Sequence, residues 1–394
     1  MNNKSCILSS FEKIFNYPPK LVFSAPGRTE LSGNHTDHQH GKVLAAAVNL
    51  DTQAAVALNG ENLIRVKSEG YPECVIDLDD LGVNPEETGT TAALIRGVAA
   101  RIKELTGKCV GFDAYVTSTV LPGSGLSSSA AFEVLMGTII NHFCGCGLTP
   151  VEIAQIGQYA ENVYFGKPCG LMDQTASAVG NIVTIDFEDT FAPVVEPIDF
   201  DIAKSGYDLC IIDSGADHAD LTDEYAAIPG ELKKVCAVFG KKWLCQVAED
   251  EFYSRIPEVR AAAGDRAVLR AIHVFEENKR VGRQVEALQN GDMDTFLRLM
   301  TESGKSSWMY LQNVIPAGSK AHQELALALA ITEKLLAGRG GFRVHGGGFA
   351  GTLQAFVPND MTADFKEKIE AVLGEGKCHV LSIRHEGGIL MEKL

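Results

Sequence analysis

The sequence has no long apolar run, no excess of basic residues and no CxxC pair of cysteines. Its apolar stretches fall short of the about 20 residues that a membrane-spanning helix needs, and residues 1–15 lack the apolar segment of a signal peptide. Lys and Arg number 35 against 51 Asp and Glu, so the formal net charge is −16. This acidity disfavours nucleic acid or an anionic membrane as a partner, and we expect neither.

The ten cysteines are scattered, and only Cys144 and Cys146 lie close together. The chain also lacks an HExxH motif, and with it the ordered second set of ligands on which a zinc site usually draws. Without a disulfide framework, reduced thiols are the simplest interpretation of these cysteines. We therefore expect a cytoplasmic protein.

Length and residue patterns predict a mixed α/β protein of two domains. At 394 residues the chain exceeds one ordinary core. Strand-like runs cover 21–25, 42–50, 52–58, 112–120, 181–187, 208–214 and the end of 343–358, and helical periodicity covers 90–105, 129–143, 150–164, 267–288 and 322–337. Two prolines within 187–201 place the boundary near 190–205, which gives domains 1–195 and 196–394.

Residues 121–133, LPGSGLSSSAAFE, have the composition of a phosphate-holding loop ahead of a helix. Glycines let the backbone approach a ligand, serines offer hydroxyls, and the helix start supplies unpaired N–H groups with partial positive charge. The segment is not a Walker loop, because no Lys follows, and not GxGxxG, because Ser128 stands at the third glycine. An ordinary serine-capped helix is the alternative on local sequence alone.

Residues 25–42, APGRTELSGNHTDHQHGK, gather a dense set of polar side chains into a short predicted loop: Arg28, Asn34, His35, Asp37, His38 and His40. We favour a polyhydroxyl-binding loop. A metal site is a weaker interpretation, since His and carboxylate at short spacing are metal ligands, and a solvated polar loop is the third.

Residues 160–180 place Glu161 and Asp173 on either side of a break at 166–168. We expect Glu161 near the end of one helix and Asp173 near the start of the next element. Two acids at such a junction can divide the work of phosphoryl transfer, one holding magnesium and the other facing the acceptor hydroxyl. Taken alone, an exposed helix acid is the commoner case.

Residues 343–353, RVHGGGFAGTL, contain three consecutive glycines at 346–348. These glycines allow the backbone to pass against a bound group, although a plain glycine turn explains them equally well in isolation. The segment lies in the other half of the chain from the first loop. A site built from all four segments would therefore lie in a cleft between the domains.

The segments PGRTELSGNHTDHQHG, LPGSGLSSSAAFE, KPCGLMDQ and RVHGGGFAG resemble the galactokinases of the GHMP kinase superfamily, in the same order along the chain. DEY at 223–225 and RAIHVFEENKRV at 270–281 extend the resemblance. It implies a GHMP-kinase-like fold of two lobes with the active site in the cleft between them. It also implies an ATP-dependent sugar-1-kinase that uses Mg²⁺, with D-galactose as the leading acceptor.

The resemblance implies roles for individual residues. The triphosphate of ATP would lie on Gly123, Ser124, Gly125, Leu126, Ser127, Ser128 and Ser129, and Gly346, Gly347 and Gly348 would close the site from the second domain. Ser129 and Glu161 would bind Mg²⁺. Asp173 would face the anomeric hydroxyl as base or orienter, with Arg28 beside it and the travelling phosphoryl group. The sugar would contact Asn34, His35, Asp37, Gly170 and Tyr225.

Two departures from the family pattern concern the substrate. Galactokinases carry Glu beside the sugar-binding His, where it helps read the C6 hydroxyl; this chain has Asn34, and AAIPGELKK replaces the paired arginines after Tyr225. Asn34 removes the roughly 4 kcal/mol repulsion that a Glu would exert on a C6 carboxylate. Galacturonate or another galacto-configured sugar is therefore an alternative acceptor. A sugar and ATP sensor without turnover and a metallohydrolase using loop 34–40 are the other open classes.

Overall fold

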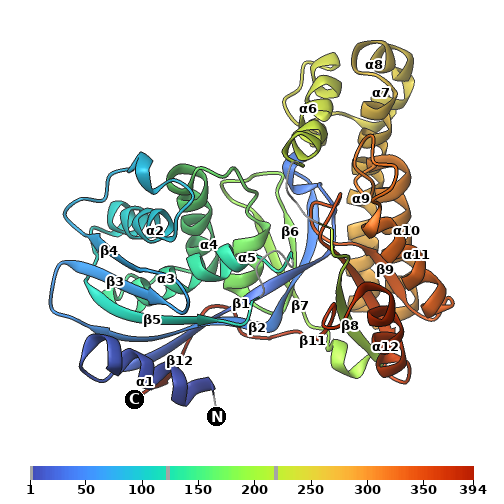
Figure 1. The fold of residues 1–394 in the computed structure, drawn as a ribbon. Helices are drawn as coiled ribbons and strands as arrows, with labels where there is room; N and C mark the ends of the chain where they lie inside the picture. Colours follow the sequence, from blue (N-terminus) through green and yellow to red (C-terminus); the bar gives the residue numbers. More distant parts are fainter. Residues whose placement is uncertain (1–2, 121–124, 217–220) are drawn as a thin grey trace.

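Two β-sheets with helices packed on them organise the two halves of the molecule (Figure 1). The computed structural model describes residues 3–120, 125–216 and 221–394. Gly123 and Ser124, two of the predicted phosphate-loop residues, lie outside the described residues. The mixed α/β architecture with two lobes confirms the predicted fold class.

The first half is built on an eight-stranded sheet, counted over the described part of the chain. Its order is β12-β1-β2-β5-β3-β4, while β6 pairs with both β2 and β7. Of the pairings, β3 with β5 is parallel. The strands are β1 (Leu21–Ser32), β2 (Lys42–Leu58), β3 (Leu63–Ser68), β4 (Glu73–Asp77), β5 (Phe112–Ser118), β6 (Ile182–Asp186), β7 (Val194–Ile198) and β12 (Ile389–Lys393).

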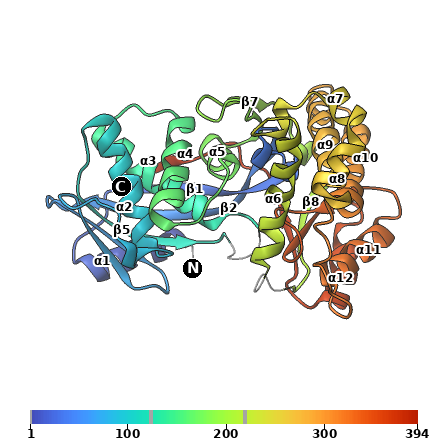
Figure 2. The ribbon, with the colours of Figure 1, turned by 90° about the horizontal axis from the view of Figure 1, so that it is seen from above.

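Helices cover both faces of this sheet (Figures 1 and 2). Alternate residues of β2 point to opposite faces: Ala54 and Val56 join the core under helices α2–α5, whereas Ala55 and Ala57 pack against α1. The helices are α1 (Asn3–Phe15), α2 (Thr91–Thr106), α3 (Ser128–Cys144), α4 (Pro150–Tyr159) and α5 (Met172–Val179).

The second half has an antiparallel sheet in the order β11-β8-β10-β9. Its strands are β8 (Tyr207–Asp213), β9 (Gly341–Val344), β10 (Thr352–Pro358) and β11 (Cys378–Leu381). Its helices are α6 (Thr222–Val238), α7 (Glu249–Ser254), α8 (Ile256–Ala263), α9 (Asp265–Gln289), α10 (Met293–Ser306), α11 (Glu324–Leu336) and α12 (Thr362–Leu373). No helix in the described ranges is both long and apolar enough to cross a membrane.

An apolar core joins the two halves. Leu31 and Leu44 of the first sheet share one cluster with Ile211 of β8, Phe296 of α10 and Phe356 of β10. Strands β1 and β2 extend from the first half towards this junction (Figure 1). The division at 195/196 stays a prediction; β7 spans that point, and β12 returns to the first sheet.

The predicted strands and helices all coincide with observed elements, but two boundaries are wrong. The runs 42–50 and 52–58 form the single strand β2. The strand predicted to end at 25 continues to Ser32, because Arg28, Thr29 and Glu30 pair in regular register with β2. Arg28 therefore lies in a strand rather than in a polar loop.

Candidate active site

A cavity of about 490 Å³ lies where β1 and the loop after it meet the second half of the chain. Its wall includes segments around α5, helix α6 and the glycine loop after β9. It brings together Arg28, Asn34, His35, Asp37, Gly170, Asp173, Tyr225, Gly346 and Gly347, all of them predicted site residues. A cavity lined by residues from both halves of the chain agrees with the cleft expected from the four sequence segments.

Arg28 and Asp173 form a bidentate ion pair in the cavity wall. Arg28 Nε lies 2.7 Å from Asp173 Oδ1, and Nη2 lies 2.6 Å from Oδ2. Asp173 stands in the first turn of α5, as the sequence predicts. Its side chain keeps 29% of its surface exposed, against 8% for Arg28. A substrate hydroxyl can therefore reach the carboxylate while the guanidinium holds it in one orientation.

Ser127 holds the same carboxylate from another direction. Its Oγ donates to Asp173 Oδ2 over 2.6 Å. Burial alone would raise the pKa of Asp173, but the Arg28 guanidinium and the Ser127 hydroxyl outweigh it and hold that pKa below its ordinary value. Asp173 is thus ionised at neutral pH, which suits an orienting carboxylate better than a strong proton acceptor.

The described end of the glycine/serine loop lies against this pair. The Arg28 backbone N–H donates to Leu126 O over 3.0 Å, and its guanidinium donates to Gly125 O. Gly125 has a φ of +73°, and a Cβ there would lie 2.9 Å from His345 Nδ1. The Ser127 hydroxyl makes no capping bond to α3. The simple helix-cap interpretation therefore does not account for Ser127.

Ser129 and Glu161 meet at the start of α3. Ser129 Oγ donates to Glu161 Oε1 over 3.2 Å, and the Lys167 ammonium lies 3.6 Å from the same oxygen. Glu161 is buried in the π-helical turn Ala160–Phe165 that follows α4, close to the predicted helix end. A hydroxyl and one carboxylate suit Mg²⁺, which prefers few protein oxygens and completes its shell with phosphate and water.

Gln174 and Glu133 support Glu161 from behind, and the sequence patterns did not identify either. Gln174 Nε2 lies 2.9 Å from both Glu161 Oε2 and Glu133 Oε2. Burial, together with the Glu161 charge, raises the pKa of Glu133 well above its ordinary value. The available signal was spacing: Glu133 follows Ser129 by four residues and so shares its helix face.

His35 and Asp37 belong to a short loop that connects β1 to β2 and touches the second half. His35 has a φ of +62°, and its Nε2 lies 3.0 Å from Gly347 O. Burial lowers the pKa of His35 to about 4, so the ring is neutral at pH 7. Asp37 Oδ1 accepts from His38 N over 2.8 Å. The loop therefore presents a carboxylate on a fixed backbone.

If Gly170 contacts the sugar, as the family resemblance implies, Gly170→Ala is expected to impair sugar binding, because a Cβ at this position would overlap Asp37 Oδ2. Asp37 or loop 166–171 must then move by about an ångström, and such displacements cost up to about a hundredfold in kcat/KM. Steady-state kinetics should show this loss for the sugar, with the Kd of ATP unchanged. Gly282→Ala is the control, since a Cβ there meets open space. Equal kinetics for the two variants would contradict the placement of Gly170.

Asn34 is 1% exposed and lies within a network of buried polar groups. Its Nδ2 donates to Gly346 O over 2.7 Å and to Glu30 Oε1 over 3.2 Å. Glu30, which the sequence patterns did not identify, also lines the cavity and pairs with the fully buried Arg343. Burial raises the pKa of Glu30, and the Arg343 guanidinium opposes that change.

Tyr225 and the three glycines form the wall from the second half. Tyr225 Oη donates to Gly348 O over 2.9 Å. A Cβ at position 347 would lie 2.8 Å from the Tyr225 ring, and Gly348 has a φ of +81°. The close approach of this loop to Tyr225 therefore depends on glycine at 347 and 348.

A second cavity of about 300 Å³ lies on the other side of the α3 start. Ser128 and Ser129 line it together with apolar side chains, among them Leu94, Val116 and Phe132. Ser127, one residue earlier, bonds to Asp173 in the first cavity. The N-terminus of α3 therefore separates a polar cavity from a partly apolar one.

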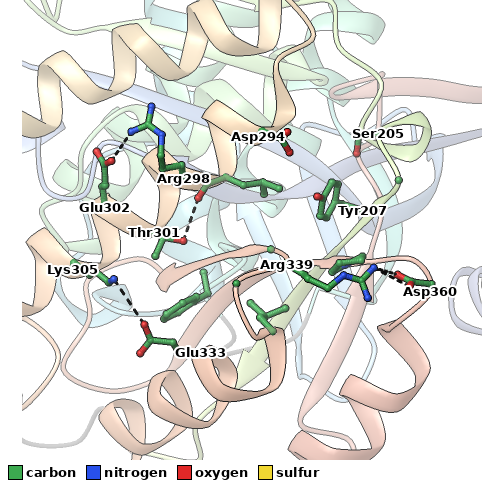
Figure 3. A pocket seen from close by; sticks show the side chains of 17 residues that line it. Ser205, Tyr207, Asp294, Arg298, Thr301, Glu302, Lys305, Glu333, Arg339 and Asp360 are labelled. Carbon is green, nitrogen blue, oxygen red and sulfur yellow. Dashed lines mark hydrogen bonds and ion pairs between the residues drawn. The ribbon is translucent and has the colours of Figure 1, made fainter.

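A larger cavity, of about 870 Å³, lies elsewhere, between α10, α11 and the second sheet (Figure 3). It contains none of the predicted site residues. Its cations face acids: Arg298 with Glu302, Lys305 with Glu333, and Arg339 with Asp360. These partly exposed pairs balance one another's charge and leave no unpaired group among them for catalysis. Because the predicted site residues line the smaller cavity instead, we place the active site there.

Two protein families match the chain. Residues 93–181 match the GHMP kinases N terminal domain. Residues 9–58 match the galactokinase galactose-binding signature, and this range includes Arg28, Asn34, His35 and Asp37. The two matches cover the start of α3 and the strand and loop that carry most of the cavity's polar residues.

Similar proteins match more than nine tenths of the chain. A galactokinase of Glaesserella parasuis is 32% identical over 372 residues, 92% of this chain and 90% of its own length. One of Actinobacillus pleuropneumoniae is 33% identical over 91% of both chains. The structure of Lactococcus lactis galactokinase complexed with galactose superposes with a TM-score of 0.83 at 24% identity, covering 99% of this chain and 100% of that one. Mevalonate kinase of Methanococcus jannaschii shares the fold, with a TM-score of 0.66, 15% identity, and coverage of 92% and 98%.

Proposed function

The chain belongs to the galactokinase family of GHMP kinases, and we propose that it transfers the γ-phosphoryl group of ATP to the anomeric hydroxyl of D-galactose. The observation that carries this proposal is the Arg28–Asp173 pair, exposed to a polar cavity and bonded to the start of α3. The products are galactose 1-phosphate and ADP. The ten cysteines of the chain are free thiols, which agrees with a cytoplasmic location.

We assign the two cavities to the two substrates. The sugar occupies the cavity of about 490 Å³, where Asp37, Gly170, Asp173 and Tyr225 offer polar contacts. The nucleoside occupies the partly apolar cavity of about 300 Å³. The triphosphate then lies along the N-terminus of α3, whose unpaired N–H groups and partial positive charge favour anions.

Ser129 and Glu161 hold Mg²⁺ in this proposal, with Gln174 orienting Glu161. When bound, Mg²⁺ neutralises phosphate charge and fixes the geometry of the triphosphate. The chain contributes Arg28, which lies between Gly125 and Asp173 and can stabilise charge on the travelling group. Two protein ligands, Ser129 and Glu161, are few, as Mg²⁺ prefers.

Asp173 orients the anomeric hydroxyl by accepting its proton in a hydrogen bond. The lowered pKa of Asp173 makes full proton transfer late, when the phosphoryl group has already drawn charge from the hydroxyl. Alignment of hydroxyl and phosphate supplies much of the acceleration in such a site. Gly346, Gly347 and Gly348 close the cavity from the second half of the chain.

An ADP-release screen tests the proposal. The purified chain is supplied with Mg²⁺, ATP and each of galactose, galacturonate, galactosamine, N-acetylgalactosamine, arabinose and glucose. We expect the highest kcat/KM for galactose. Binding of sugar and ATP without ADP release would make the protein a sensor. Activity in the absence of ATP would make it a hydrolase.

A further inference from the structure

The side-chain amide of Asn34 has no hydrogen-bonding capacity left for a sugar. Besides its two Nδ2 bonds to Glu30 and Gly346, its Oδ1 accepts from Asn313 Nδ2 over 2.8 Å and from Ser307 Oγ over 3.2 Å. An amide offers two donors and two acceptor lone pairs, so all four positions are occupied. At 1% exposure, Asn34 serves to hold its surroundings together.

Glu30 is the neighbouring group that retains an acceptor. Its bonds from Arg343 and Asn34 both go to Oε1. Within the described ranges no hydrogen bond engages Glu30 Oε2. This oxygen also keeps some exposed surface, since it is absent from the fully buried polar atoms that lack a partner. Because Glu30 lines the cavity, Oε2 is available to a ligand there.

The position of Glu30 suits the far end of a pyranose. Arg28 and Glu30 are two residues apart on a regularly paired part of β1, so they share a face of the strand. Two residues of strand span about 6.6 Å, which is on the scale of a pyranose ring with its substituents. A sugar whose anomeric hydroxyl lies at Asp173, beside Arg28, would direct its C6 end towards Glu30, which lines the same cavity.

We propose that Glu30 is the specificity-determining residue for the C6 end of the sugar, with its Oε2 accepting a hydrogen bond from a neutral primary hydroxyl. This inference rests on the proposed function and narrows its substrate class. A C6 carboxylate would face Oε2 without a proton between the two acceptors, so a uronic acid is excluded. Arg343 lies behind Glu30 and is bonded to it, which compensates the buried charge of Glu30 instead of presenting a cation to the sugar.

A double-change cycle, in which the Glu30 carboxylate and the C6 hydroxyl are removed separately and together, tests this hydrogen bond directly. kcat/KM is measured at pH 8 for wild type and Glu30→Gln on galactose, 6-deoxygalactose and galacturonate. A hydrogen bond to a charged group corresponds to about 10- to 100-fold. Wild type should therefore favour galactose over 6-deoxygalactose by about that factor, and Glu30→Gln should lose most of this preference. Galacturonate should be a poor substrate of wild type and improve relative to galactose in the variant.

A second variant covers the case in which Glu30→Gln unfolds because Arg343 loses its partner. Glu30→Gln with Arg343→Met removes both charges and leaves no unpaired buried ion. Either variant must bind ATP with the wild-type Kd, which shows that the nucleotide side is intact. The inference is overturned if the folded variant keeps the wild-type preference for galactose over 6-deoxygalactose, or if wild type uses galacturonate as well as galactose. Absence of any sugar phosphorylation by wild type would instead contradict the proposed function itself.

Discussion

Asp173→Asn is expected to lower kcat by roughly 10²–10⁴ while leaving the Kd of ATP nearly unchanged. The amide keeps the shape of the carboxylate and one acceptor for Arg28, but it cannot take the proton of the anomeric hydroxyl. Asp173 touches Arg28 and Ser127 and is exposed to the sugar cavity, so the loss should fall on the chemical step. Single-turnover kinetics and a nucleotide titration provide the two readouts.

Asp360→Asn is the matched control for this change. It also breaks an Asp–Arg pair, with Arg339, but at the large cavity, which shares no lining residue with the proposed active site. Its kcat should stay within about twofold of wild type, as expected for a partly exposed pair. Wild-type turnover in Asp173→Asn together with weakened ATP binding would reverse our assignment of the residue.

Arg28→Met is expected to reduce kcat/KM by about 10³ or more. The Arg28 guanidinium contacts both the phosphate-loop residue Gly125 and the acceptor-facing Asp173. Arginines positioned in this way contribute to phosphoryl transfer on this scale. The change also leaves Asp173 without its bidentate partner, so the melting temperature must be measured beside the kinetics. A folded Arg28→Met variant with kcat/KM near the wild-type value would refute the role of this pair.

Arg28→Lys separates charge from geometry. Lysine keeps the positive charge but is a point charge without the planar fork that grips both Asp173 oxygens. We expect activity between that of wild type and Arg28→Met, with stability closer to wild type. Equal losses in the Lys and Met variants would show that the bidentate geometry, and not the charge alone, is required.

The sequence was sufficient for the local chemistry of the site. Asp173 lies in the first turn of a helix after a break, and Glu161 lies in the turn after the preceding helix, both close to where the pattern put them. Glycine at 125, 346 and 348 is explained by positive φ values. These features are local, since they follow from a residue's own backbone preferences and its nearest neighbours in the chain.

Pairings between distant segments could not be predicted in the same way. Glu30 was missed because β1 was taken to end at 25, and its continuation depends on pairing with β2 at Ala45 to Ala47. Asn313 and Ser307 bond to Asn34, and Arg343 bonds to Glu30, each across more than 270 residues of the chain. The hydrogen bonds that occupy the Asn34 side chain come from this tertiary network and cannot be read from the sequence. For that reason Asn in place of the family's Glu at position 34 was interpreted as a direct change in sugar contact.

The most direct test of the central claim is the identity of the phosphorylated product. The purified chain is incubated with ATP, Mg²⁺ and galactose, and the product is identified by ³¹P NMR with coupling to the sugar protons. The account predicts stoichiometric ADP and a phosphate coupled to the anomeric proton, which is galactose 1-phosphate. Phosphate on any other hydroxyl, or no phosphorylated galactose from a folded protein that binds both substrates, would contradict it.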